Sequence, residues 1–326
     1  MARLINLIVD PSGPLNLSAT TINVSSSGNL WYDNTDNRLK FSCFGGAWSA
    51  GGSLITARQQ LAGAGTQNAG LAFGGQTNPP TRVSCTEEYN GSSWSAGGSL
   101  ITARNLLAGT GTQNAGLAIG GFFPPTNSSC TEEYNGSTNI WSAGGALITA
   151  RAGSAGAGEQ NAGLAFGGQD SGFNFVSCTE EYNGSSWSSG GALSNSRYEL
   201  AGAGTQSAGL AFGGAGPYST VSCTEEYNGS TNIWSAGGNL ITPRYWLAGA
   251  GTQNAGLAFG GRSADPVSCT EEYNGTSWSV GGALSNTNYT LAGAGTQSAG
   301  LAFGGVRNFS LSSTEEYNIC IQSTTL

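Results

Sequence analysis

The chain has 326 residues, of which 38% are hydrophobic and only 9% are charged, and its formal net charge is −8 at pH 7. The hydrophobic fraction is sufficient for one large domain or two ordinary ones. A single lysine, Lys40, and the acidic balance argue against nucleic acid and anionic membranes as partners, because both require clustered Lys and Arg.

The N-terminal 38 residues stand outside the pattern of the rest of the chain. Their start, MARLINLIVDPSG, has one basic residue, a short apolar stretch and no small-residue cleavage site, and is therefore a poor secretory signal. No apolar run of the chain approaches the ~18 residues of a membrane span. We therefore expect synthesis in the cytoplasm without a secretory signal. The following INLIVDPSGPLNLSATTINV alternates like strands that have no partner in the later repeats, which predicts an arm for docking onto another subunit.

The stretch GNLWYDNTDNRLKF, residues 28–41, resembles a short hairpin of bacteriophage tail-fibre and other virion appendage proteins, where similar Gly-x-Leu-Trp-x-Asp and Arg-Leu segments lead into a following module. The resemblance implies a virion or an extracellular appendage, with residues 1–38 contacting other copies of the chain or other subunits. The DNTDNR letters within it could form a calcium loop, but a solvated turn is the favoured interpretation. We expect neither a metal nor a cofactor.

From residue 39 onward a repeat runs to the C-terminus. Six tryptophans each open a Trp-Ser pair at intervals of 46, 47, 46, 47 and 44 residues, namely Trp48, Trp94, Trp141, Trp187, Trp234 and Trp278. Each is followed by a block like LAGAGTQNAGLAFGG and then by Thr-Glu-Glu-Tyr, starting at Thr86, Thr131, Thr179, Thr224, Thr270 and Thr314. The chain therefore contains six units, and a period near 45 residues is typical of propeller blades.

The sequence pattern of each unit predicts four short strands joined in two hairpins. The second hairpin turns through an Asn-Gly pair in most units. No segment has helical periodicity. The predicted fold is all-β, a six-bladed β-propeller spanning 39–326, with blades at about 61–99, 107–146, 152–192, 200–239, 247–283 and 291–320. The sixth unit lacks its Trp strand, so residues 46–51 are expected to supply it and close the ring.

The Gly-Gly pair that ends the second strand, the Glu-Tyr of the third, the Trp shortly after and the Arg before the next blade resemble the kelch repeat. The Tyr-to-Trp spacing is 5 or 7 residues, as between Tyr89 and Trp94 or Tyr134 and Trp141, and kelch repeats usually lie between these values. The resemblance covers about 39–326 and implies the fold, while it implies little about function.

The Glu-Glu pairs supply 12 of the 19 acidic residues. Two carboxyl groups could suggest glycosidase chemistry, but neighbours on a strand point to opposite faces, so one pair cannot flank a glycosidic bond. We expect one Glu of each pair to point between blades and form an ion pair with a repeated arginine, and the other to face solvent. The arginines are Arg58, Arg104, Arg151, Arg197 and Arg244, and the sixth position holds Asn288.

Five cysteines hold one repeat position, and we expect small buried hydrophobic side chains there, because copies on separate blades lie too far apart to share a metal ion. Cys43 and Cys320 break this pattern. Both fall where the first Trp strand meets the last unit, so either a disulfide closes the ring or two free thiols lie there. Without histidine, Ser-His and Cys-His nucleophiles are excluded.

The repeats diverge in two places, after each Gly-Gly and directly after each Arg. Both are expected to lie on one face of the ring, opposite the uniform turns. Candidate ligand-binding residues there are Phe122, Phe123, Phe173, Phe175, Tyr218, Tyr245, Trp246, Arg262 and Phe309. Aromatic loops on a rigid scaffold suit carbohydrate or protein ligands, although unconstrained loops can also simply drift in sequence.

These observations favour a non-enzymatic virion or appendage protein whose variable loops attach to a surface carbohydrate or protein. One alternative is a purely structural subunit of a fibre, filament or shell decoration. A glycan-active enzyme is a weaker alternative, supported only by the supply of carboxyl groups.

Overall fold

The computed structural model describes residues 30–33, 38–42, 46–319 and 321–325. All regular elements within these residues are β-strands, and no helix among them is long and apolar enough to span a membrane. The described strands fall into two compact units, divided between residues 44 and 45 and between residues 319 and 320. The docking arm expected before residue 30, the turn at 34–37, Cys43 and Cys320 lie outside the described residues.

The smaller unit contains a three-stranded antiparallel sheet in the order β1 (Leu30–Asp33), β2 (Arg38–Ser42) and β31 (Ile321–Thr325). The hairpin expected near residues 28–41 is therefore present, and the C-terminal strand pairs with it. Because β2 and β31 satisfy each other's backbone hydrogen bonds, they belong to this unit. The division thus falls later than the expected 38/39 boundary, and the propeller ends earlier, at residue 319.

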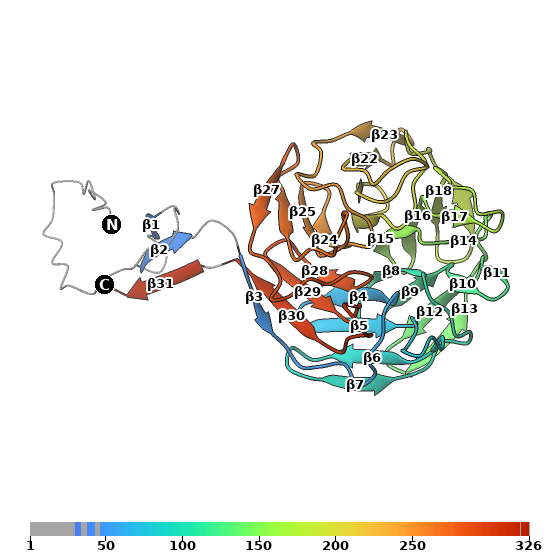
Figure 1. The fold of residues 1–326 in the computed structure, drawn as a ribbon, viewed down its shortest axis with the longest axis horizontal. Coiled ribbons are helices and arrows are strands. Elements are labelled where there is room, and N and C mark those ends of the chain that lie inside the picture. Colours follow the sequence, from blue (N-terminus) through green and yellow to red (C-terminus); the bar gives the residue numbers. More distant parts are fainter. Residues whose placement is uncertain (1–29, 34–37, 43–45, 320, 326) are drawn as a thin grey trace, which may run out of the picture. The chain divides into compact units, whose positions relative to one another are not determined.

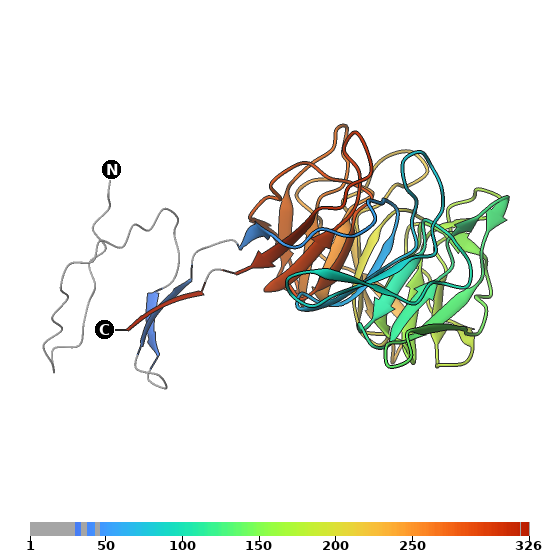
Figure 2. The same ribbon diagram turned by 90° about the horizontal axis from the view of Figure 1, so that it is seen from below.

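The larger unit consists of six four-stranded antiparallel sheets, arranged as the blades of a β-propeller (Figure 1) and seen from the side in Figure 2. Blade 1 contains β4 (Ala62–Thr66), β5 (Ala69–Phe73), β6 (Thr86–Tyr89) and β7 (Trp94–Gly97). Blade 2 contains β8 (Ala108–Gly111), β9 (Gly116–Ile119), β12 (Thr131–Asn135) and β13 (Ile140–Ala143). Blade 3 contains β15 (Ala155–Glu159), β16 (Ala162–Phe166), β18 (Thr179–Tyr182) and β19 (Trp187–Ser189).

The remaining blades repeat this order of strands. Blade 4 contains β20 (Ala201–Gly204), β21 (Gly209–Phe212), β22 (Thr224–Asn228) and β23 (Ile233–Ala236). Blade 5 contains β24 (Ala248–Thr252), β25 (Ala255–Phe259), β26 (Thr270–Tyr273) and β27 (Trp278–Gly281). Two short pairs, β10 (Phe122–Phe123) with β11 (Thr126–Asn127) and β14 (Arg151–Ala152) with β17 (Gln169–Asp170), lie in the variable loops.

Blade 6 confirms the predicted ring closure. It contains β28 (Ala292–Gly295), β29 (Ala299–Phe303) and β30 (Thr314–Asn318), and its outer strand is β3 (Ala47–Ala50) from the start of the propeller. Trp48 lies opposite Tyr317, as the Trp and Tyr of the other blades lie opposite each other. The first and last strands of the propeller sequence therefore lie side by side in one sheet, which closes the ring.

The innermost strands alternate alanine and glycine because the blades crowd the axis. Ala62 and Ala64 of β4 are buried, whereas a Cβ atom placed on Gly63 would lie 2.7 Å from the carbonyl oxygen of Gly293 in the neighbouring blade. Real Cβ atoms do not approach backbone oxygen this closely, so only glycine fits.

A repeated set of side chains joins each blade to the one before it. At the joint between blades 3 and 4, the hydroxyl of Tyr227 donates to Glu181 Oε1 at 2.6 Å, and Trp234 Nε1 donates to Thr179 Oγ1 at 2.9 Å. Phe166 packs against the Trp234 ring with 5.0 Å between centroids. The tyrosine bond returns at all six joints, including the seam, and so does the tryptophan bond.

These contacts correct the expectation that one glutamate of each pair faces solvent. Glu181 is half-buried and accepts the hydrogen bond from Tyr227 of the next blade. Burial and this glutamate raise the pKa of Tyr227 above its ordinary value, so the tyrosine remains a neutral donor. The second glutamate is thus the polar contact between blades, a role that we had expected for the glutamate paired with arginine.

The first glutamate of the pair forms an ion pair with a buried arginine in each of the five repeats that contain this arginine. Arg197 Nη2 lies 3.0 Å from Glu225 Oε1, and the corresponding pairs are Arg58 with Glu87, Arg104 with Glu132, Arg151 with Glu180 and Arg244 with Glu271. Arg197 also donates to the carbonyl oxygens of Gly213 and Cys223. The arginine precedes the inner strand of the same blade, so the pair fixes the incoming connection to its own blade and does not bridge two blades.

Blade 6 lacks this ion pair, as Asn288 in the arginine position implies. Asn288 Nδ2 donates to the Gly304 carbonyl oxygen at 2.8 Å, while the half-buried Glu315 accepts a bond from the backbone N–H of Ser285 at 2.9 Å.

The repeated cysteines are less buried than expected. Cys85, Cys178, Cys223 and Cys269 are half-buried and Cys130 is exposed, each with a free thiol. The arginine side chain occupies the interior next to them, with Arg244 Nη1 2.8 Å from Cys269 Sγ. The cysteines therefore line the arginine site and do not form part of the apolar core.

We predict that Arg197→Asn lowers the free energy of unfolding by about 3–5 kcal/mol, because it leaves the Glu225 carboxylate buried without its counter-charge. Urea unfolding followed by tryptophan fluorescence measures the change. Arg197→Asn combined with Glu225→Gln should recover part of the loss. Arg307→Asn is the matched control at an exposed arginine and should change stability by less than about 0.5 kcal/mol. An unchanged Arg197→Asn protein would show that the pair contributes nothing.

Candidate functional site

The two variable segments of each unit lie together on one face of the propeller, which we call the loop face. The residue that follows the repeated arginine forms an antiparallel β-bridge with the residue that follows the Gly-Gly pair of the same blade. Tyr198 pairs in this way with Ala215, and Tyr245 with Arg262. The uniform turns meet on the opposite face, where the Gly136 N–H donates to the Asn114 carbonyl oxygen at 3.0 Å. The variable residues therefore share one surface.

The predicted binding residues divide into two groups by exposure. Phe123, Phe173, Tyr218 and Phe309 are strongly exposed, with Tyr218 at 100% and Phe173 at 74%. Phe122, Phe175, Tyr245, Trp246 and Arg262 are half-buried because they pack against other loop residues. Phe175 stacks on Tyr198 with 4.5 Å between ring centroids, and the Arg82 guanidinium lies 4.8 Å from the Phe122 ring centre.

A closed ring of backbone hydrogen bonds surrounds the axis at the centre of the loop face. Six residues, one from each connection between blades, each donate an N–H to the carbonyl oxygen of the preceding member at 2.7–3.0 Å, namely Gln60, Leu106, Gly153, Glu199, Trp246 and Thr290. All six have positive φ, between 53° and 61°. Five of them are not glycine, and such backbone strain is concentrated at functional sites in proteins.

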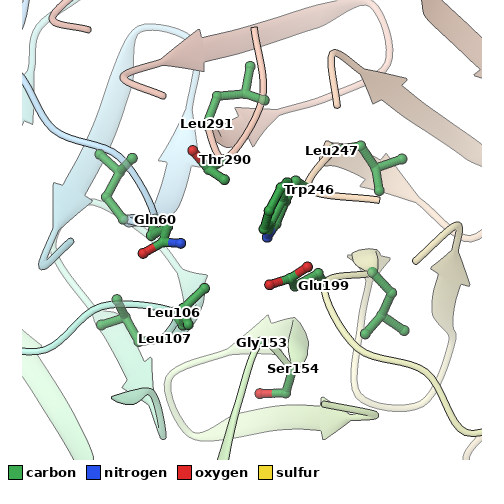
Figure 3. Close-up of a pocket in the computed structure, with 12 residues that line it drawn as sticks. Gln60, Leu106, Leu107, Gly153, Ser154, Glu199, Trp246, Leu247, Thr290 and Leu291 are labelled. Atoms are coloured by element: carbon green, nitrogen blue, oxygen red, sulfur yellow. The ribbon is translucent and has the colours of Figure 1, made fainter. Parts of the chain in front are cut away.

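The side chains of this ring form a depression of about 80 Å³ at the axis, which we call the mouth (Figure 3). The Trp246 indole nitrogen points toward the Glu199 carboxyl group of the preceding ring member. Ser154 Oγ, Glu199 Oε2 and Trp246 Nε1 are buried and make no hydrogen bond within the described part of the chain. Three buried polar groups at the mouth thus lack a hydrogen bond of normal geometry, although buried polar groups are normally paired, and the Trp246 indole and the Glu199 carboxyl group are close enough to interact only weakly.

The mouth continues into a cavity of about 160 Å³ between blades 2 and 3, which we call the groove. Its walls include Phe122, Phe173 and Tyr198, and it shares Leu106, Gly153 and Glu199 with the mouth. The groove opens here because Ala152 and Gly153 are the smallest of the six residue pairs that follow the arginine position. A Cβ atom on Gly153 would lie 3.3 Å from Glu199 Cγ.

Glu199 is the one residue with a carboxyl group or a basic side chain among those that line the mouth and the groove. It is 9% exposed. Burial raises its pKa to about 8, while the Trp246 indole and the Tyr198 hydroxyl nearby partly oppose this rise. At neutral pH Glu199 is therefore mostly protonated and offers both a hydrogen-bond donor and an acceptor.

Of the residues that line the mouth and the groove, Phe122, Phe173 and Trp246 were expected from the sequence, whereas Glu199, Gly153 and Gln60 were missed. The available signal was the second residue after each arginine position, which differs in all six copies. Side-chain type was the wrong criterion, because selecting aromatic residues retained only Trp246 of the six ring members.

Neither the family models nor the curated proteins contain a match to this sequence. Among solved structures, one titled "Structure of YjhT" aligns with a TM-score of 0.71 at 11% sequence identity, covering 83% of this chain and 99% of that chain. At this identity the likeness concerns the fold alone. The chain is a six-bladed β-propeller.

We predict that the free energy of unfolding falls as the pH rises from about 4.5 to about 8, because the folded Glu199 holds a proton that the unfolded chain has released. Subtracting the pH profile of Glu199→Gln from that of the native protein isolates this contribution. Tryptophan fluorescence of the folded protein should also titrate near pH 8, and Trp246→Phe should abolish that step. A native profile parallel to that of Glu199→Gln would contradict the assignment.

Proposed function

We propose that the protein is a non-enzymatic binding module of a virion or similar appendage, whose loop face attaches to a surface carbohydrate. The observation that carries the proposal is that each repeat has a nearly uniform part and a variable part, and that the variable parts share one face. The joints and the opposite turns are nearly uniform, whereas the loop face carries the exposed Phe123, Tyr218 and Phe309 together with the mouth and its unpartnered polar groups. Aromatic faces and a few fixed polar groups on a rigid scaffold are the features of a recognition site.

The tail-fibre-like sequence at 28–41 supports the proposal by resemblance. Hydrolysis of glycosides uses two carboxyl groups about 5–9.5 Å apart. The residues that line the mouth and the groove supply a single one, Glu199. This arrangement supports binding over glycoside cleavage.

We predict that the triple substitution of Phe123, Tyr218 and Phe309 by serine weakens attachment at least tenfold, because it removes the exposed aromatic contacts. Fluorescently labelled protein is tested on an array of microbial surface polysaccharides and on intact bacterial cells. The matched control is Ile140→Ser with Ile233→Ser, two exposed apolar residues beside the turns of the opposite face. Equal loss in both variants, or no attachment of the native protein, would refute the proposal.

A structural subunit is the second candidate, and one observation favours it. Ile55, Ile101, Ile148 and Ile241 occupy the same repeat position in four connections, and each is 55–62% exposed. Exposed apolar side chains repeated in this way suit contact with another subunit. If this function holds, light scattering should show concentration-dependent assembly of the full chain, and substituting these four residues by serine should abolish it. A monomer at all concentrations would count against it.

A further inference from the structure

The three unpartnered groups at the mouth define what the site can bind. The Trp246 indole can only donate a hydrogen bond, whereas the Glu199 carboxyl group and the Ser154 hydroxyl can each accept one. A ligand hydroxyl can accept from the indole nitrogen and donate to a carboxyl oxygen at the same time. A ligand ammonium group has no acceptor for the indole N–H, so it would leave Trp246 unsatisfied.

The charge of the site argues against an anionic ligand. The residues that line the mouth and the groove include no lysine or arginine, and the whole chain carries a formal net charge of −8. A buried anion without a counter-charge is costly. The polar groups therefore fit an uncharged ligand that is rich in hydroxyl groups.

The small volume and the aromatic lining of the groove suit a single sugar ring. Phe122, Phe173 and Tyr198 present aromatic surface to the C–H face of a ligand. The mouth and the groove, at about 80 and 160 Å³, are smaller than the roughly 300–1,000 Å³ of sites for drug-sized ligands. Further sugar units would lie outside, where Phe173 and Phe123 are exposed.

We propose that the mouth and the groove beside Gly153 bind one uncharged pyranose ring of a glycan, with a ring hydroxyl held between Trp246 Nε1 and the Glu199 carboxyl group. This inference rests on the proposed carbohydrate-binding function and gives it a location and a ligand class. The exposed aromatic residues on the remaining loop face then contact the rest of the glycan.

The test uses the full chain and saturation-transfer NMR with glucose, galactose, mannose and N-acetylglucosamine, and with glucuronate and glucosamine as charged counterparts of glucose. At least one neutral sugar should bind, and glucuronate and glucosamine should bind at least tenfold more weakly. Preferred binding of either charged sugar, or binding of none of the six, would overturn the proposal.

Two variants locate the binding. Gly153→Gln fills the groove with the side chain that Gln60 carries at the same ring position and at a similar φ, and it should abolish the NMR signal. Trp246→Phe removes the indole N–H and keeps an aromatic ring, so it should weaken binding about five- to thirtyfold, corresponding to about 1–2 kcal/mol. Thermal unfolding verifies that both variants are folded. Unchanged sugar binding in folded Trp246→Phe or in folded Gly153→Gln would place the sugar elsewhere.

The same variants separate this inference from the proposed function. If the native chain attaches to cells or polysaccharides and folded Gly153→Gln attaches equally well, the loop face binds but the groove is not its sugar site. If a neutral sugar binds in the groove but the native chain attaches to no cell or polysaccharide, the site is correct and the attachment function is wrong. Tyr218 lies outside the groove, so Tyr218→Ser serves as a control and should leave monosaccharide binding unchanged.

Discussion

A closed ring of six blades requires the same geometry at every joint, and the tyrosine–glutamate and tryptophan–threonine bonds impose it. Both bonds recur at all six joints, and at the seam Tyr317 and Trp48 supply them from opposite ends of the propeller sequence. A change in any one joint would have to be absorbed by the other five. This explains why the chain repeats its joint residues almost letter for letter while its loops diverge.

One joint departs from the rule, and it lies next to the groove. Five joints pack a phenylalanine against the tryptophan of the next blade, as Phe166 does with Trp234. Between blades 2 and 3 the corresponding residue is Ile119, which belongs to the same apolar cluster as Trp187. The same pair of blades carries the small Ala152 and Gly153 and encloses the groove. The irregular joint and the candidate site thus occur together.

The fold could be predicted because the length and number of the repeats can be read directly from the sequence. Counting tryptophans gave the number of blades, and the missing strand in the last unit gave the closure by residues 46–51. The ion pairs between one glutamate and the repeated arginine were predicted correctly, but their placement between blades and the solvent-facing role of the other glutamate were wrong, since strand alternation does not say which neighbour each face meets. Glu199 escaped prediction because its burial depends on Trp246 and Gly153, which come from other blades. The pairing of β31 with β2 was also missed, since neither strand belongs to the repeat.

The hydrogen bonds that define the mouth use only backbone atoms. Their six members carry an amide, an aliphatic group, no side chain, a carboxyl group, an indole and a hydroxyl group on the same left-handed backbone. Any of these side chains can be exchanged without the loss of a ring hydrogen bond. Ligand preference can therefore change through a few substitutions at these positions while the blades remain intact, and a library randomised there would sample new specificities on one unchanged scaffold.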